Sequence, residues 1–163
     1  MDVVYRYYNG VRGDARLLTT NNLLVGAAGF AEIGGFDVTM ATSEDREFCE
    51  RWRWNGKQIK YVPQAVVLHA NRQTLHEFWL QQFGYGRGAY HVHAARRKRG
   101  ERPDYREPSF HLAVGNWLGY PIARTRGWDR AKVALLLLMW QLANASGYLY
   151  EGLLSQCNVR PGR

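Results

Sequence analysis

The sequence predicts an α/β fold that is followed by a hydrophobic helical tail. Residues 17–26 form an apolar run with β-forming residues around a polar centre, which is typical of a buried strand. Residues 42–54 offer Thr42 or Ser43 as a cap, have acidic side chains in the first turn and are followed by Asn55-Gly56, which is the pattern of a capped helix. Residues 133–150 contain no charged side chain. A strand–helix alternation followed by an apolar helix indicates this architecture.

Size and composition limit the class of protein. The chain has 163 residues, of which 46% are hydrophobic and 22% are charged, which excludes wholesale disorder. The formal net charge is +8, from 22 basic and 14 acidic residues, and indicates an anionic partner such as nucleic acid, a lipid surface or a phosphorylated substrate. Two cysteines are too few for a disulfide scaffold or a zinc site.

Three further segments complete the expected α/β part. Residues 28–33 predict a short helix. Residues 57–70 predict a strand pair or a kinked strand, with Pro63 at a bend or an edge because proline cannot donate to a ladder. Thr74 and Glu77 have the spacing of a capping box, so a helix is expected to begin there.

The basic segment 96–106 separates two regions of different character. Before it lies the α/β part, residues 1–95, and after it the sequence becomes apolar and rich in glycine. We therefore expect a basic linker and interfacial segment at 96–130 and a hydrophobic helix, a possible membrane anchor, at 131–163.

Adjacent carboxylates at Glu44 and Asp45 are the first candidate for chemistry. Both fall in the first turn of the expected helix, where exposed N–H groups and the helix dipole favour negative charge. A carboxylate held in this way can act as a general base toward a hydroxyl group. Acidic residues are also common in first turns because they stabilise helices, so both interpretations stay open from this pair alone.

An ordered series of short motifs surrounds this pair. The series is Thr20 to Val25, Gly34-Gly35-Phe36-Asp37, Glu44-Asp45, Trp52-Arg53-Trp54-Asn55-Gly56, Tyr61-Val62-Pro63 and Val66-Val67-Leu68-His69. In this order, residues 17–95 resemble the C-terminal half of a family-2 glycosyltransferase with the GT-A fold. The resemblance implies a partial, Rossmann-like GT-A domain from an inverting enzyme that moves a sugar from a nucleotide-sugar donor to a hydroxyl acceptor, in polysaccharide or glycolipid synthesis.

The resemblance assigns roles to individual residues. Asp45 matches the base that deprotonates the acceptor hydroxyl, and Glu44 would support the acceptor or orient that base. A glycine-rich turn matches the wall beside the donor sugar, where a bare backbone permits close approach. The residues of this turn are Gly34, Gly35, Phe36 and Asp37.

Four more positions follow from the same resemblance. Asn21 and Asn22 would hydrogen-bond sugar hydroxyls, although they are equally typical of polar residues satisfied within a strand. His69 would complete the shell of a divalent metal, Mg or Mn, although a lone histidine at a strand end is commonly structural. Arg72 would contact the diphosphate, unless it is a solvated loop residue.

The segment 81–85 departs from the family's Gln-x-x-Arg-Trp motif. Gln81 is in place as a substrate-binding candidate, but Gly84 and Tyr85 stand where arginine and tryptophan belong. Arg87 is the nearest cation that would substitute for the missing arginine. This departure argues against a processive polymer synthase.

The family's Asp-x-Asp motif is missing from the sequence. We therefore expect an acceptor-side fragment of a larger enzyme. The nucleotide-binding half and the other metal ligands would lie in the part that is lacking, and the fragment alone would be inactive.

The apolar run 133–150 indicates a membrane partner. It has 18 uncharged residues, near the length needed to cross a bilayer, but polar side chains interrupt it. Cations precede it, which places the chain on the cytoplasmic face of a membrane as a peripheral or single-span protein. These cations are Arg124, Arg126, Arg130 and Lys132. The alternative function is a non-catalytic membrane-associated interaction domain. A nucleic-acid-binding module is disfavoured because no recognition motif accompanies the basic residues.

Overall fold

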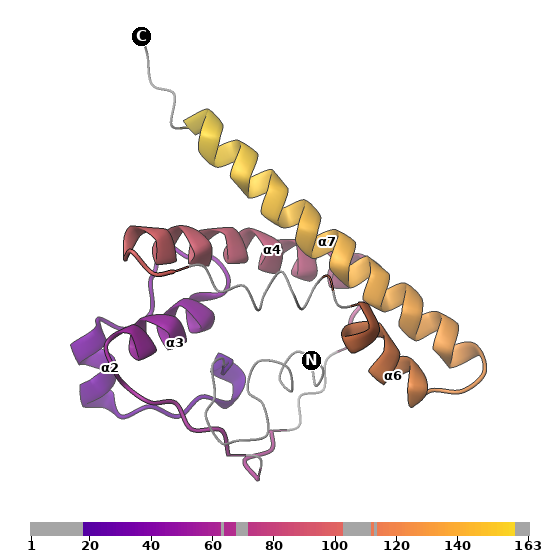
Figure 1. Ribbon diagram of the computed structural model, residues 1–163, viewed down its shortest axis with the longest axis horizontal. Helices are drawn as coiled ribbons and strands as arrows, with labels where there is room; N and C mark the ends of the chain where they lie inside the picture. The colour runs from indigo at the N-terminus through magenta and orange to yellow at the C-terminus, as the bar shows by residue number, and fades with distance from the viewer. Residues whose placement is uncertain (1–17, 63, 68–71, 103–111, 113, 159–163) are drawn as a thin grey trace. The chain divides into compact units, whose positions relative to one another are not determined.

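The computed structural model describes residues 18–62, 64–67, 72–102, 112 and 114–158. The chain forms two compact units, residues 1–71 and residues 72–163, and each is described by itself. The described part of both units is built from helices and connecting segments (Figure 1). The division of the sequence at residues 95 and 130 stays a prediction.

The predicted α/β fold, a partial Rossmann-like GT-A domain, is wrong. Residues 17–26 were expected to form a strand, but the 3-10 helix η1, Thr20–Asn22, occupies their centre. Across the described ranges no β-strand forms, and a single bridge residue at Lys60 is the nearest approach to one. Val62, Val66 and Val67 lie more than half exposed, so the β-forming residues of this segment find no cross-strand neighbours in the described part. A preference for strands comes mainly from packing against such neighbours, and without them the pattern does not produce a sheet.

Two helices follow η1 in the first unit. Helix α2 is Ala27–Ile33, which confirms the short helix expected there, and it ends at Gly34 in the left-handed conformation with φ of 88°. Helix α3 is Glu44–Trp54. Its N-cap is Ser43, which has φ of 66° and makes no side-chain capping bond.

An aromatic cluster joins α2 to α3. Phe30, Phe36 and Phe48 have ring centroids between 5.1 and 5.3 Å apart, and the tilted ring of Trp52 lies 5.7 Å from that of Phe48. Phe48 is 2% exposed. A Cβ at Gly29 would lie 2.9 Å from the Trp52 ring, so the absence of a side chain lets α2 approach α3 closely.

The second unit contains the two longest helices. Helix α4 is Leu75–Lys98, and the predicted capping box at its start is confirmed, because the Thr74 hydroxyl accepts from the Glu77 N–H while the Glu77 carboxylate accepts from the Thr74 N–H. A π-helical turn η2, Gly115–Gly119, leads into α6, Tyr120–Ala123. Helix α7 is Trp128–Asn158 and includes the uncharged run 133–150, whereas residues 159–163 of the predicted helix lie outside the described residues.

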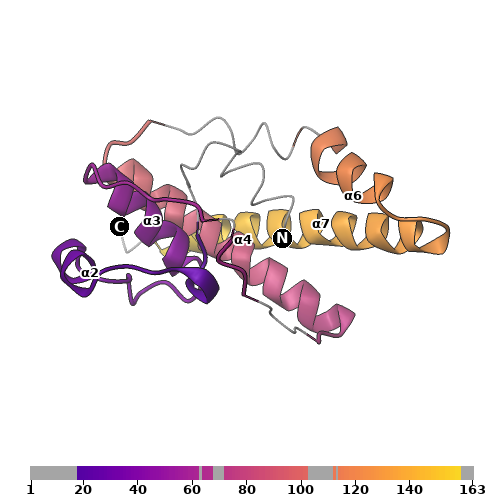
Figure 2. The same cartoon turned by 90° about the horizontal axis from the view of Figure 1, so that it is seen from below.

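Helices α4 and α7 cross at two glycines (Figures 1 and 2). A Cβ built on Gly86 would lie 2.1 Å from the carbonyl oxygen of Asn144, and one on Gly147 would lie 2.0 Å from the carbonyl oxygen of Phe83. The two backbones are therefore in direct contact. Val92 of α4 and Ala143 of α7 are completely buried.

Polar side chains lie between the same two helices. Glu151, which is 8% exposed, accepts from Nε of Arg87 at 2.6 Å and lies 2.9 Å from Nε2 of His91. Closer to the crossing, Asn144 donates to the side-chain oxygen of Gln82 at 3.4 Å. Burial opposes ionisation of Glu151, but the bonds from Arg87 and His91 outweigh it, so the pKa of this carboxyl lies below its ordinary value.

The Glu151 contacts are expected to make the stability of this unit sensitive to acid. A carboxyl whose pKa is lowered by folding stabilises the folded state above its unfolded pKa, near 4.5, and that contribution is lost as the pH falls through the folded value. The free energy of unfolding should therefore differ between wild type and Glu151→Gln at pH 7, and the difference should shrink below pH 4.5. Denaturant titrations at several pH values measure it, and a difference that stays constant down to pH 3 would contradict this account.

Candidate functional site

The first turn of α3 presents the candidate base Asp45, as the sequence predicted. The Asp45 carboxylate accepts from the Thr20 N–H at 3.1 Å and from the Arg46 N–H at 2.7 Å. Thr20 is the first residue of η1, so Asp45 satisfies a donor that the short helix leaves unpaired at its N-terminus. These two bonds hold a partly exposed carboxylate in one position. Glu44 is the first residue of the same helix and is also partly exposed.

The two candidate asparagines lie beside this carboxylate, in η1. Asn22 donates from its side chain to the carbonyl of Ala65 at 2.6 Å, and its backbone N–H donates to the carbonyl of Thr19. Both Asn21 and Asn22 are exposed. Asn21 and Asn22 therefore follow directly after the residue whose N–H bonds to Asp45, in a 3-10 helix instead of the predicted strand, and a binding role for them stays a prediction.

Arg51, in the last turn of α3, holds the glycine turn after α2 by hydrogen bonds. The Arg51 guanidinium donates to the carbonyl of Ile33 and, at 2.7 Å, to the carbonyl of Gly35. Gly34 and Gly35 both have positive φ, of 88° and 68°. Arg51 lies six residues after Asp45, which is a rise of about 9 Å along the helix. Helix α3 thus carries the carboxylate near one end and the glycine turn near the other.

The remaining residues of this turn have structural contacts of their own. The Phe36 ring belongs to the aromatic cluster described above. Asp37 accepts from the N–H of Thr39 at 2.9 Å and from the Thr39 hydroxyl at 2.6 Å, which closes a local turn. A binding role for both residues stays a prediction.

Sequence reasoning missed the Glu47–Arg51 pair that holds the turn. The Glu47 carboxylate accepts from Nε of Arg51 at 3.0 and 3.1 Å and from a terminal nitrogen at 2.8 Å, and Glu47 is 3% exposed. A bidentate pair of this kind fixes the guanidinium so that its other N–H groups can reach the carbonyls that end α2. The glutamate–arginine spacing of four residues is a signal for the pair, but the carbonyls it reaches are not visible in a sequence.

Cys49 lies within the same unit and is not a nucleophile at neutral pH. It is 1% exposed, and its thiol donates to the carbonyl of Leu18 at 3.6 Å. Burial raises the pKa of the Cys49 thiol to about 11, in spite of the Leu18 bond, which lowers it. The protonated thiol packs as a small apolar side chain.

Three candidate binding residues belong to the second unit. Gln81 accepts from the side-chain amide of Gln73 at 3.1 Å, near the start of α4. Arg87 is tied to Glu151 and lies with its guanidinium 5.6 Å from the centre of the Tyr150 ring, and about half of its side chain is exposed. Arg72 is exposed. Gln81 and Arg87 are therefore both built into contacts within their unit.

The structure supplies no further support for a metal centre. His69, the predicted ligand, lies outside the described residues. In the ranges that are described, no three histidine, cysteine, aspartate or glutamate side chains gather closely enough to hold a metal ion. The described residues by themselves therefore form no such group.

Comparisons with known proteins connect part of this chain to a sugar transferase. A segment of 58 residues is 36% identical to the pre-mycofactocin glycosyltransferases of two Mycobacterium tuberculosis strains, CDC 1551 / Oshkosh and ATCC 25618 / H37Rv. The segment is 36% of this chain and spans only 12% of the length of those relatives. No family model matches the chain. No solved structure matches it either. Part of the chain is therefore similar to part of a glycosyltransferase.

Proposed function

We propose that this chain is the acceptor-side part of an inverting glycosyltransferase, similar to those of family 2, which moves a sugar from a nucleotide-sugar donor to a hydroxyl acceptor. The similarity to the pre-mycofactocin glycosyltransferases carries the proposal. The position of Asp45 supports it, because a carboxylate fixed by two backbone N–H groups at the start of α3 is suited to proton abstraction.

The proposed reaction needs one proton transfer to this chain. Asp45 takes the proton of the acceptor hydroxyl as its oxygen attacks the anomeric carbon. The bond from that carbon to the diphosphate oxygen breaks, and the nucleoside diphosphate leaves with the electron pair. Attack from the face opposite the leaving group inverts the configuration. Asn21 and Asn22 are proposed to hydrogen-bond acceptor or sugar hydroxyls beside Asp45.

The sequence has no Asp-x-Asp motif. We therefore propose that residues outside the described part form the donor site and bind a divalent metal, Mg or Mn. His69 stays a candidate ligand. Arg72, Gln81 and Arg87 stay candidate contacts for the donor. We infer from the 12% coverage of the relatives that the activity belongs to a longer protein.

The test is a transfer assay on the complete protein that contains this chain, with the 163-residue chain alone for comparison. Sugar-labelled UDP and GDP donors are incubated with hydroxyl acceptors, and labelled product and released nucleoside diphosphate are counted. We expect equal amounts of both from the complete protein, a loss of at least tenfold on chelation with EDTA that Mn or Mg restores, and no transfer by the chain alone. A folded complete protein that yields neither product contradicts the proposal.

A further inference from the structure

Helix α7 is arranged with its apolar residues outward and its polar residues inward. The residues of α7 with contacts to α4 are polar, aromatic or small, and they include Asn144, Gly147, Tyr148, Tyr150, Glu151 and Gly152. Five leucines of α7 are instead about half exposed or more. Their exposed fractions are 64% for Leu135, 49% for Leu138, 61% for Leu142, 65% for Leu149 and 64% for Leu153. A soluble helix pair has the opposite distribution, with its leucines between the helices.

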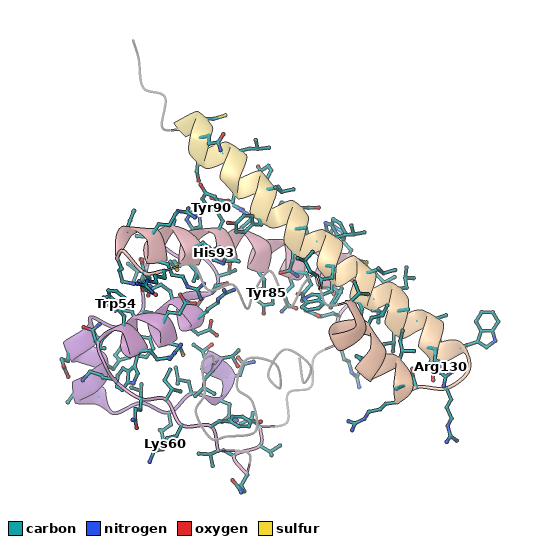
Figure 3. The ribbon with its side chains drawn as sticks, in the orientation of Figure 1. Trp54, Lys60, Tyr85, Tyr90, His93 and Arg130 are labelled. Atoms are coloured by element: carbon teal, nitrogen blue, oxygen red, sulfur yellow. The ribbon has the colours of Figure 1, made fainter. Side chains whose placement is uncertain are left out.

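These five leucines lie along one side of α7. Successive members are separated by three, four, seven and four residues, and a helix with 3.6 residues per turn keeps such positions on one side. The same geometry places the stripe roughly opposite the residues that contact α4. Figure 3 shows hydrocarbon side chains along the side of α7 away from α4, with Tyr90 between the two helices. We call Leu135, Leu138, Leu142, Leu149 and Leu153 the leucine stripe.

The N-terminal end of the leucine stripe bears an aromatic anchor and positive charge. Trp128, the first residue of α7, is 85% exposed, and tryptophan is favoured at the boundary between water and lipid. Arg130 and Lys132 follow it, and Figure 3 shows Arg130 projecting from this end of the helix. Arg124 and Arg126 precede it. Positive charge beside an uncharged apolar stripe is complementary to a surface of anionic lipids.

The position of α4 distinguishes a helix that lies on a membrane from one that crosses it. Helix α7 is long and apolar enough to span a bilayer, and only 11% of its apolar window is buried. However, α4 crosses it at Asn144, close to the middle of residues 133–150. A spanning α7 would draw the crossing part of α4 into the bilayer with the polar pair Gln82–Asn144, and would bring the Arg87–Glu151 ion pair to the lipid boundary, where polar and charged groups are costly to bury.

We propose that α7 lies in the plane of an anionic membrane surface, with the leucine stripe in the lipid and α4 on the side that faces water. In this orientation the polar groups between α4 and α7 stay away from the hydrocarbon. The exposed leucines lose their contact with water, which is favourable in proportion to the apolar area that they bury. This inference does not depend on the proposed sugar transfer.

Co-sedimentation of the 163-residue chain with sealed vesicles tests the proposal. We expect binding to vesicles of phosphatidylcholine with 30% phosphatidylglycerol and weaker binding to pure phosphatidylcholine. The double variant Leu142→Glu, Leu149→Glu should lower the partition coefficient at least tenfold. The matched control is Leu75→Glu, Leu80→Glu on α4, where both leucines are also more than half exposed, and it should change the coefficient less than twofold.

A second variant tests the contribution of charge. Arg130→Gln, Lys132→Gln leaves the leucine stripe intact and should reduce both the binding to anionic vesicles and its sensitivity to salt. Equal binding by all of these variants, with circular dichroism spectra like that of wild type, overturns the proposal. Self-association that the leucine variant abolishes, in a chain that does not bind vesicles, also overturns it and assigns the stripe to a second copy.

The orientation is tested with Cys157, which is exposed near the C-terminal end of α7, whereas Cys49 is buried. A membrane-impermeant maleimide added outside sealed vesicles should modify Cys157 of the bound chain as fully as in detergent. Protection of Cys157 until detergent is added would show that α7 crosses the bilayer, and would overturn the in-plane arrangement.

Discussion

Replacing Asp45 with asparagine is expected to lower the turnover of sugar transfer at least a hundredfold in the complete protein, the usual scale for the loss of a general base. Asparagine has nearly the same shape, and its side-chain oxygen can still accept from the Thr20 N–H. The variant therefore removes the proton acceptor while retaining the bond that holds η1. The measurement is kcat with saturating donor and acceptor, together with the thermal unfolding midpoint.

Glu32→Gln is the matched control for Asp45→Asn. It removes one carboxylate from the same unit, and Glu32 forms an exposed ion pair with Lys57 at 2.7 Å, with about two thirds of its own side chain exposed. Exposed pairs of this kind contribute about 0–1 kcal/mol, so the fold and the turnover should both be retained. Near-normal turnover of Asp45→Asn with an unchanged unfolding midpoint would remove Asp45 from the mechanism.

Substituting alanine for Gly147 is expected to destabilise the α4–α7 pair by about 3 kcal/mol, at the upper end of the usual cost of overpacking. The added methyl carbon would lie 2.0 Å from the carbonyl oxygen of Phe83, and a backbone atom cannot move aside as the end of a side chain can. The two helices must therefore separate. Denaturant unfolding followed by circular dichroism measures the change.

Gly152→Ala provides the comparison on the same helix. A methyl group there meets only the edge of the Tyr90 ring, at 3.3 Å, and that ring can shift by a few tenths of an ångström. Alanine is also a better helix former than glycine by about 1 kcal/mol at both positions. We expect Gly152→Ala to change stability by about 1 kcal/mol or less. Equal losses of unfolding free energy in both variants would show that the close backbone contact at Gly147 does not determine the stability of this unit.

The helices of this protein were largely predictable, whereas its sheet was predicted wrongly. Local signals determine where α2 and α4 end and begin: a glycine in the left-handed conformation at Gly34, and the reciprocal bonds of Thr74 and Glu77. Strands depend on neighbours that are distant in sequence, and residues 57–62 and 64–67 have apolar β-formers without such neighbours in the described part. The same β-forming composition therefore led to an extended segment and not to a ladder.

The candidate site was predictable in position but not in construction. The acidic first turn of α3 was identified from its sequence, because such turns have a local electrostatic cause. The bond from Thr20 to Asp45 joins residues 25 positions apart, and the bonds from Arg51 to Ile33 and Gly35 join residues 18 and 16 positions apart. Contacts of this range depend on how the elements pack, which the local pattern does not contain.

The carboxylate of Glu151 holds two side chains of α4 at once, Arg87 and His91, which are one turn apart. A single contact would let α7 rotate about its own axis. Two contacts on one carboxylate, close to the crossing at Gly86 and Gly147, fix that rotation. The rotation of α7 determines which of its sides faces away from α4. The contacts of Glu151 thus determine the direction in which Leu135 points, although the two residues are more than 20 Å apart along the helix, at about 1.5 Å of rise per residue.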